Sequence, residues 1–461
     1  MPIDPDTLLL SRTQFGFTLA FHILFPTLTI GLAWFLATVE ALWLKTRNPV
    51  YVQLYRFWVK VFALGFGMGV VSGVVMSYQF GTNFSRFSQI AGPVLGPLLS
   101  YEVLTAFFVE AGFIGVMLFG WEKVGPRLHF LATVLVALGT LNSSFWILAA
   151  NSWMHTPAGA ALEGGRFVVT DWWAVVFNPS FPYRLAHMVI AAFLSTSFVV
   201  AGVSAWHLLY RDRGPVARRG LSLGLLLAAL LAPTQVLIGD QSGLEVKDHQ
   251  PMKVAAMEGL WHTTQGAPLL LFALPDQDKE TNRYEIAVPN GASLVLTHSL
   301  DGEVKGLNEV PPADRPPVLP VFFAFRIMVG LGFAMLALAA WGLLQRWRGR
   351  MYDDRWLLRG CVAAIPAGFI ATVAGWVTAE VGRQPFTVYG LLRTADSVSP
   401  VPASAVVTSL IVFVAVYGLL FAAFLYYTGR VIASGPDYDQ PMPEHPEAMR
   451  GARPATVVPA E

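Results

Sequence analysis

Four residues of types that bind iron stand inside or at the end of long apolar stretches of this sequence: His22, His187, Met328 and Glu380. Haem iron accepts a neutral imidazole, and a histidine with a methionine is the axial pair of low-spin cytochromes. His187 and Met328 fit such a pair, His22 fits a single proximal ligand, and Glu380 fits a weaker oxygen ligand. The residue types therefore indicate ligation of haem iron.

Each of these residues also has an ordinary structural interpretation. A single histidine in a membrane helix often hydrogen-bonds to a neighbouring helix. Met328 is one of 13 methionines, and methionine commonly fills gaps in a core. Glu380 lies three residues before Arg383 and can instead form an interfacial ion pair with it. The residues taken together indicate a membrane protein that handles electrons or protons.

Two further carboxylates, Glu102 and Glu110, lie eight residues apart in one apolar run. In an α-helix this spacing is a rise of roughly 12 Å with an offset of about 80°, so both can line one path. A charge near the middle of a bilayer costs on the order of 2.5–3.5 kcal/mol, which a proton-handling role would explain. Hydrogen-bonded structural carboxylates are the alternative.

The composition indicates an integral membrane protein. Of 461 residues, 54% are hydrophobic and 13% are charged, with a mean hydropathy of +0.53. That charged fraction is about half of what soluble domains carry. The net charge of +1 gives no support for a nucleic-acid partner, and the single cysteine, Cys361, cannot form an internal disulfide. We expect an all-α fold.

Nine apolar runs are long enough to cross a bilayer, which takes roughly 20 residues. They lie at about 14–42, 55–80, 94–120, 127–150, 184–210, 219–239, 318–345, 357–380 and 404–429. Lysine and arginine concentrate in the links after the first, third, fifth and seventh runs. Because basic links stay in the cytoplasm, we expect an extracytoplasmic N-terminus and a cytoplasmic C-terminus. The candidate residues then gather in the outer half of the membrane, with Glu110 the deepest.

The runs divide the chain into four parts. Residues 1–239 hold six expected transmembrane helices, and residues 318–430 hold three more. Residues 240–317 form a long, polar extracytoplasmic loop between them. Residues 431–461 are rich in proline, glutamate and alanine, a composition typical of a disordered tail.

Several segments resemble subunit I of the cytochrome bd-type quinol oxidases. They are SRTQFGFTLAFHILFPTLTIG at 11–31, QFGTN at 79–83, GDQSG at 239–243, KVAAME at 253–258, FAFRIMV at 323–329 and GWVTAEVGRQPF at 375–386. They occur in family order, and the likeness covers residues 8 to 430. It implies a terminal respiratory oxidase of the bacterial inner membrane that oxidises quinol outside, reduces O2 to water and builds a proton gradient without pumping.

The resemblance implies haem ligands at four positions. His187 and Met328 would be the axial ligands of a low-spin haem b. His22 and Glu380 would each be the axial ligand of one of two high-spin haems, a haem b and a haem d, with their order left open.

The resemblance also implies roles for seven other residues. Arg326 matches an arginine near the low-spin haem, Trp376 a tryptophan of the haem cluster, and Arg383 the arginine of the GRQP signature. Glu102 and Glu110 match carboxylates assigned to the high-spin haem region and its proton supply. Lys253 and Glu258 match a pair implicated in oxidising the substrate, ubiquinol, within the extracytoplasmic loop, called the Q-loop.

The sequence departs from the family pattern in three places. Phe386 stands where many relatives have tryptophan, and Gln241 where some have glutamate. The loop is short, as in the cyanide-insensitive branch, some of whose members carry a further haem b in place of haem d.

The resemblance implies partners as well: a haem-free subunit II, a small single-span subunit, membrane lipid, quinol and O2. One rival hypothesis is a haem b subunit that oxidises quinol and passes electrons on without reducing oxygen. Another is a transporter that uses Glu102, Glu110 and Glu380 as proton sites. A transporter is expected to show related halves or broken helices, and the sequence shows no convincing ones.

Overall fold

Long helices make up most of the chain. The computed structural model describes residues 4–211 and 213–439. Within that part, nine helical segments are long and apolar enough to cross a membrane, as predicted. They are Pro5–Thr46 (α1), Pro49–Thr82 (α2), Ser85–Phe119 (α3, η1 and α4), Pro126–His155 (α5), Trp172–Tyr210 (α6 and α7), Pro215–His249 (α8), Pro312–Trp347 (η3 and α11), Arg355–Val381 (α12 and α13) and Ala403–Ser434 (α14).

Local sequence explains where several of these helices begin. Helices α1, α2, α5 and α8 each start with proline at the first helical position, where its missing N–H is not needed. The side chains of Asp4 and Asn48 cap α1 and α2 by accepting a backbone N–H. These signals lie outside the apolar runs, so most helices are longer than the runs that predicted them.

Two spans are irregular. The third changes from α3 (Ser85–Glu102) to a π-helical turn (η1, Val103–Phe107) and then to α4 (Phe108–Phe119). The eighth is interrupted between α12 (Arg355–Ala363) and α13 (Ala367–Val381), next to Pro366, whose ring cannot sit inside a regular helix. The sequence shows no convincing broken helix, whereas the structure interrupts the eighth span at this point.

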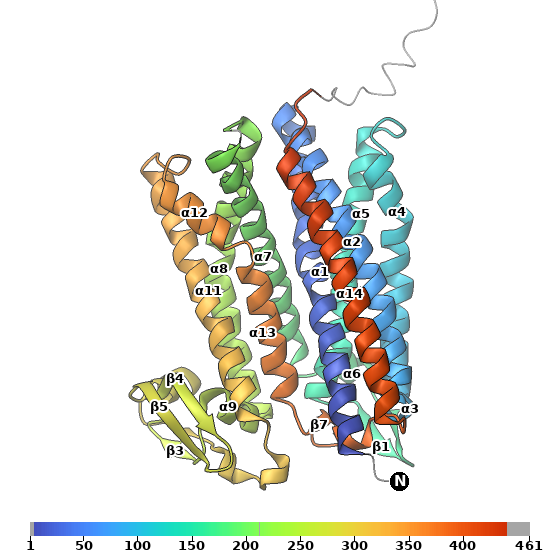
Figure 1. Cartoon of the computed structure of the whole chain (residues 1–461), viewed down its shortest axis with the longest axis vertical. Helices are drawn as coiled ribbons and strands as arrows, with labels where there is room; N and C mark the ends of the chain where they lie inside the picture. The colour runs from blue at the N-terminus through green and yellow to red at the C-terminus, as the bar shows by residue number, and fades with distance from the viewer. Residues whose placement is uncertain (1–3, 212, 440–461) are drawn as a thin grey trace, which may run out of the picture.

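The bundle has two groups of helices. In Figure 1, α7 (Phe181–Tyr210), α8, α11 (Val318–Trp347), α12 and α13 stand on the left, and α1, α2, α4, α5 and α14 on the right. Helix α1 packs against α2, α5, α7, α13 and α14, and so joins the groups. At its contact with α7, Gly31 leaves no room for a side chain, and Thr196 donates a hydrogen bond to the Leu28 carbonyl (3.0 Å). Small residues allow such close approach.

Strands occur only as short antiparallel pairs in the part of the chain described, so the all-α prediction needs this correction. They pair as β1–β2, β3–β6, β4–β5 and β7–β8. Their bounds are Ala160–Glu163 (β1), Arg166–Val169 (β2), Thr264–Gln265 (β3), Leu269–Asp276 (β4), Thr281–Val288 (β5), Glu303–Val304 (β6), Phe386–Val388 (β7) and Leu392–Arg393 (β8).

The segment expected as a loop is folded. Residues 240–249 continue α8 to His249, and a short helix, α9 (Pro251–Glu258), follows directly. Strands β3–β6, α10 (Gly291–Thr297) and η2 (Leu307–Glu309) complete a compact unit beside the end of α11. The polar GDQSG segment at 239–243 is part of α8.

The described ends of the chain lie at opposite ends of the bundle. The N-terminus is at the end where the loop unit, β1 and β7 lie, and α14 finishes at the other end (Figure 1). The expected tail at 431–461 begins as helix, because α14 continues to Ser434. Residues 440–461 lie outside the described part.

Candidate functional site

His22 of α1 has the hydrogen bond that an axial ligand needs. Its Nδ1 is 2.9 Å from the Ser72 hydroxyl of α2, and that hydroxyl donates to the Met68 carbonyl (2.8 Å). When Ser72 accepts from Nδ1–H, the lone pair is left on Nε2. Gly73 is beside the ring, since a Cβ built there would lie 3.2 Å from Cε1. The residue fits the predicted single ligand of a haem.

His187 lies on α7 and Met328 lies on α11. These two helices pack with α8 and α13. His187 faces Gly239 of α8, where a Cβ would be 3.3 Å from its Cε1. Met328 faces Gly375 of α13, where a Cβ would be 2.9 Å from Sδ. The Gln235 amide nitrogen is 3.2 Å from His187 Nε2. Glycine at residues 239 and 375 therefore lets His187 and Met328 lie close to the backbones of α8 and α13.

Glu380 is held by two helices. Its Oε2 accepts from Arg383 at 2.6 Å, which confirms the ion pair considered from the sequence. Its Oε1 accepts from Asn151 (2.9 Å) and from His155 Nε2 (3.1 Å), both near the end of α5. The side chain is 20% exposed. Glu380, next to the last residue of α13, is therefore held in place by an ion pair and by hydrogen bonds from α5.

Two more cations surround this carboxylate. Arg184 of α7 is 3.8 Å from Glu380 Oε1 and donates to Asn151 at 2.5 Å. Lys253 of α9 is buried, with its Nζ 3.0 Å from His155 Nδ1. Burial and then the charges of Arg184 and Arg383 hold the pKa of Lys253 well below its usual value. The site thus has more positive than negative charge.

Several N–H groups of this cluster are buried without a hydrogen-bond partner among the described residues. They are Nε of Arg184 and Nε and Nη1 of Arg383. Buried guanidinium groups normally have all their donors satisfied. The surplus donors and positive charge fit a group that brings carboxylates, as the propionates of haem do.

Glu258 and Lys253 share α9 but contact different partners. Glu258 is 3.3 Å from Arg326 of α11, whose guanidinium also donates to the carbonyls of Leu270 (2.8 Å) and Met257. Burial raises the pKa of Glu258, and the positive charge of Arg326 opposes that rise. Arg326 therefore ties α11 to the loop unit and to the carboxyl that the sequence assigns to quinol oxidation.

Three further predicted site residues, Trp376, Glu102 and Glu110, lie next to α5. Trp376 of α13 packs with Leu148 of α5 and Phe181 of α7. Glu102 accepts a hydrogen bond from Ser143 of α5 (2.8 Å), and Glu110 is buried against Gly139 of the same helix. Helix α5 therefore contacts three of the predicted site carboxylates: Glu102, Glu110 and Glu380.

The sequence reading missed Asn151, His155 and Arg184. The predicted fourth run ended at residue 150, one position before Asn151, although Asn151 and His155 are four residues apart and share a helix face. A second buried group was also missed: Glu40 of α1 lies 2.6 Å from His129 of α5. A glutamate inside the first apolar run was the available signal.

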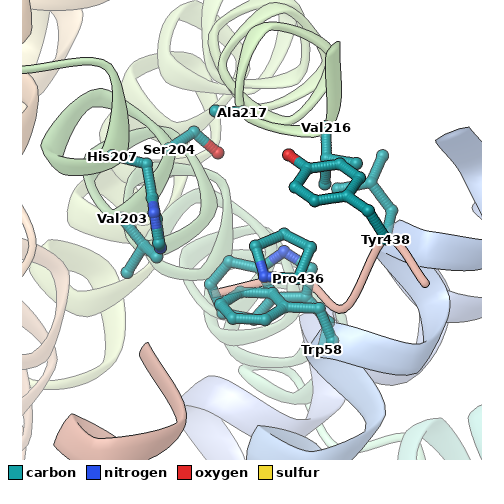
Figure 2. A pocket seen from close by; sticks show the side chains of 10 residues that line it. Trp58, Val203, Ser204, His207, Val216, Ala217, Pro436 and Tyr438 are labelled. Carbon is teal, nitrogen blue, oxygen red and sulfur yellow. The ribbon is translucent and has the colours of Figure 1, made fainter. Parts of the chain in front are cut away.

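A small pocket lies between helices of the bundle. Figure 2 shows its lining side chains, which come from α2, α7, α8 and the segment after α14: Leu54, Phe57, Trp58, Val203, Ser204, His207, Val216, Ala217, Pro436 and Tyr438. None of the predicted site residues lines it.

Sequence comparisons agree with this geometry. The family model for cytochrome bd terminal oxidase subunit I matches residues 10–436. The chain is similar to cytochrome bd ubiquinol oxidase subunit 1 of Bacillus subtilis (strain 168), with 37% identity over 94% of this chain and 95% of the relative. It is similar to cytochrome bd-II ubiquinol oxidase subunit 1 of Escherichia coli (strain K12), with 33% identity over 97% and 100%.

The fold comparison agrees too. The solved bd oxidase from Geobacillus thermodenitrificans superposes with a TM-score of 0.86 and 32% identity, over 94% of this chain and 99% of that one. The chain belongs to the cytochrome bd terminal oxidase subunit I family, the haem-bearing, multi-pass membrane subunit of respiratory quinol:oxygen oxidoreductases.

Proposed function

We propose that this subunit oxidises quinol at the end of the bundle where the loop unit lies and reduces O2 to water within the helices. The observation that carries the proposal is the surroundings of three expected ligands, His22, His187 and Met328. Each faces a glycine on a neighbouring helix, and His22 Nδ1 lies within hydrogen-bond distance of the Ser72 hydroxyl. Family membership supports the same reaction.

Glu258 and Lys253 divide the work of quinol oxidation. Glu258 accepts the first proton, because burial raises its pKa toward the range in which a carboxylate is an effective general base. Lys253 orients the substrate and stabilises the anion left by that proton. A negative charge arriving beside Lys253 favours its protonated form and offsets the burial that lowers its pKa.

His187 and Met328 would hold a low-spin haem b, and His22 and Glu380 the two high-spin haems, a haem b with either haem d or a further haem b. The group at His187 and Met328 would supply single-electron transfer, and those at His22 and Glu380 would supply the oxygen chemistry. Arg184 and Arg383 would hold the propionates with their surplus N–H groups.

Protons for water formation come from the opposite side of the membrane through Glu110 and then Glu102. Two quinols supply four electrons and release four protons at the loop end, and one O2 consumes four electrons and four protons. The chemistry balances without a pumped proton. Each charge carried across the membrane stores about 2.3 kcal/mol per 100 mV.

The working enzyme is a complex in the bacterial inner membrane. We propose a haem-free subunit II as partner, with a small single-span subunit as a third member. The N-terminus and loop unit would face outward, because the basic links then lie in the cytoplasm.

The deciding test is a reduced-minus-oxidised absorption spectrum of the purified complex, followed by oxygen uptake with quinol. A b-type signal with uptake supports the proposal, and an added band far in the red identifies haem d. A b-type signal without uptake favours the electron-transfer subunit. Absence of any haem signal contradicts the ligand assignments and favours a transporter. The His187→Ala variant should lose the low-spin signal.

A further inference from the structure

The third span contains one turn that is not α-helical, and it separates the two carboxylates assigned to proton supply. Residues Val103–Phe107 are π-helical, and the N–H of Phe108 bonds to the carbonyl of Val103, five residues back. Glu102 immediately precedes this turn, and Glu110 follows it in α4. Single π turns are rare and are concentrated at functional sites.

The turn changes how the two carboxylates face. In an unbroken α-helix, eight residues give an offset of about 80°. A π turn holds one extra residue, so the flanking helices keep the phase of a seven-residue separation, an offset of about 20°. The offset expected from the sequence is therefore wrong. Glu102 and Glu110 project from nearly the same face of the third span.

Contacts with α5 agree with this phase. Glu102 accepts its hydrogen bond from Ser143, and Glu110 packs on Gly139. Ser143 and Gly139 are four residues apart, so they share one face of α5. The extra residue is accommodated on the outside of the span, where Val103 is 42% and Leu104 60% exposed.

Gly139 is as important to this arrangement as the turn. A Cβ at residue 139 would lie 2.5 Å from Cγ of Glu110, 3.2 Å from Oε1 and 3.4 Å from Cδ. The first of these distances is shorter than real Cβ contacts, so the glutamate would have to leave its position. Glycine at residue 139 lets the Glu110 side chain pack directly against α5.

We propose that the π turn and Gly139 act together as a positioning device that aligns Glu102 and Glu110 along one face of α5 as a single proton-transferring pair. This inference rests on the proposed role of the two carboxylates in proton supply. It assigns a purpose to the irregular turn and identifies Gly139 as a positioning residue for the reaction.

The first test moves the carboxylate by one residue, in the E102Q/V103E variant of the whole complex. In an unbroken helix, residue 103 would be in phase with Glu110, and turnover would recover. With the π turn, residue 103 projects away from α5, so kcat should stay as low as in E102Q alone, about tenfold or more below wild type. Recovery to the wild-type rate would overturn the inference.

The second test compares Gly139→Ala with Gly112→Ala. Gly112 lies in α4 and has open space where its Cβ would be, so it is a matched control. We expect G139A to slow proton uptake after oxygen is added by about tenfold, with kcat lowered, the KM for quinol unchanged and the haem spectrum intact. Equal uptake rates in G139A and G112A would overturn the proposal even if the E102Q/V103E variant fails to fold.

Failure of the underlying function gives a different result. If E102Q and E110Q both keep the wild-type rate of proton uptake, the carboxylates do not supply protons, and the positioning proposal falls with that role. If both lose it while G139A keeps it, only the positioning proposal is wrong.

Discussion

At the scale of single residues, glycines decide where the expected iron ligands can lie. Gly73, Gly239 and Gly375 each face one of these ligands from a neighbouring helix. A side chain at any of the three would meet the imidazole or thioether that has to reach iron. Each expected ligand therefore has a glycine next to it, and the two residues lie on different helices.

The Met328 pair gives a direct prediction. In Gly375→Ala the new Cβ would be 2.9 Å from Sδ, so the thioether has to move and the low-spin haem should become largely high-spin. A reduced-minus-oxidised absorption spectrum measures this change. Gly330→Ala is the matched control, because residue 330 lies on α11 close to Met328 and has no atom near its Cβ position. Identical spectra for the two variants would contradict the assignment.

The Glu258 site predicts a pH dependence. Glu258 accepts a proton only when ionised, so the acid limb of kcat/KM for quinol should follow its pKa. Burial raises that pKa and Arg326 lowers it. Removing the charge in Arg326→Gln should raise the pKa further and move the acid limb to higher pH. Arg326→Lys keeps the charge and should leave the limb close to wild type. A limb that stays in place or moves lower in Arg326→Gln would exclude Glu258 as the base.

At the scale of elements, one helix, α5, contacts several of the predicted site residues. Its polar residues His129, Thr133, Thr140, Ser144, Asn151 and His155 follow each other at spacings of four and seven, which places them on one helical face. One end of this face contacts Glu40, and the other contacts Glu380. The carboxylates Glu102 and Glu110 pack beside its middle. One helix thus contacts groups on α1, the third span and α13.

The buried pair at the first end of α5 predicts a large effect on stability. Glu40 and His129 are both fully buried, 2.6 Å apart, and Thr133 donates to the same carboxylate at 2.6 Å. Removing one partner of such a pair costs about 3–5 kcal/mol. Glu40→Ala should therefore lower the thermal inactivation midpoint of the purified complex markedly. The double variant E40L/H129L removes both polar partners, so its inactivation midpoint should fall less than that of E40A. A wild-type midpoint for E40A would show that the pair is not needed for stability.

At the scale of the whole molecule, the proposed function separates proton release and proton uptake to opposite ends of the bundle. Lys253, Glu258 and Glu380 lie on or next to the loop unit, at the end where the N-terminus lies. The proposed source of protons for water is the opposite end. Separating release from uptake generates a gradient through the reaction itself.

This separation predicts a proton stoichiometry. In vesicles with the loop end outside, as many protons should be released outside as electrons reach oxygen, and an uncoupler should abolish the resulting gradient. A pH-sensitive dye measures release, and an oxygen electrode measures electrons. The Glu110→Gln variant, with intact haem spectra, should slow both equally. A release larger than the electron count would contradict transfer without pumping.

Much of this architecture can be predicted from short stretches of the sequence. Apolar length alone predicts nine spans, because a bilayer sets a minimum length for any apolar helix. His22, His187 and Met328 stand out as polar or sulfur-bearing residues in apolar runs, and the motifs around them carry the family. Helix ends were less predictable, since proline and cap residues extend the helices beyond the apolar runs, as in α8.

Other features depend on contacts between segments far apart in the sequence. Asn151, His155 and Arg184 become part of the Glu380 site only because α5 and α7 pack beside α13. Lys253 and Glu258 look like one pair along the chain, yet α9 directs them to different partners. The π turn at Val103–Phe107 was not predicted, and Thr105 within it accepts hydrogen bonds from Asn142 and Trp146 of α5. Spacing along a chain sets which residues can share a helix face, whereas the neighbouring helices decide which groups that face meets.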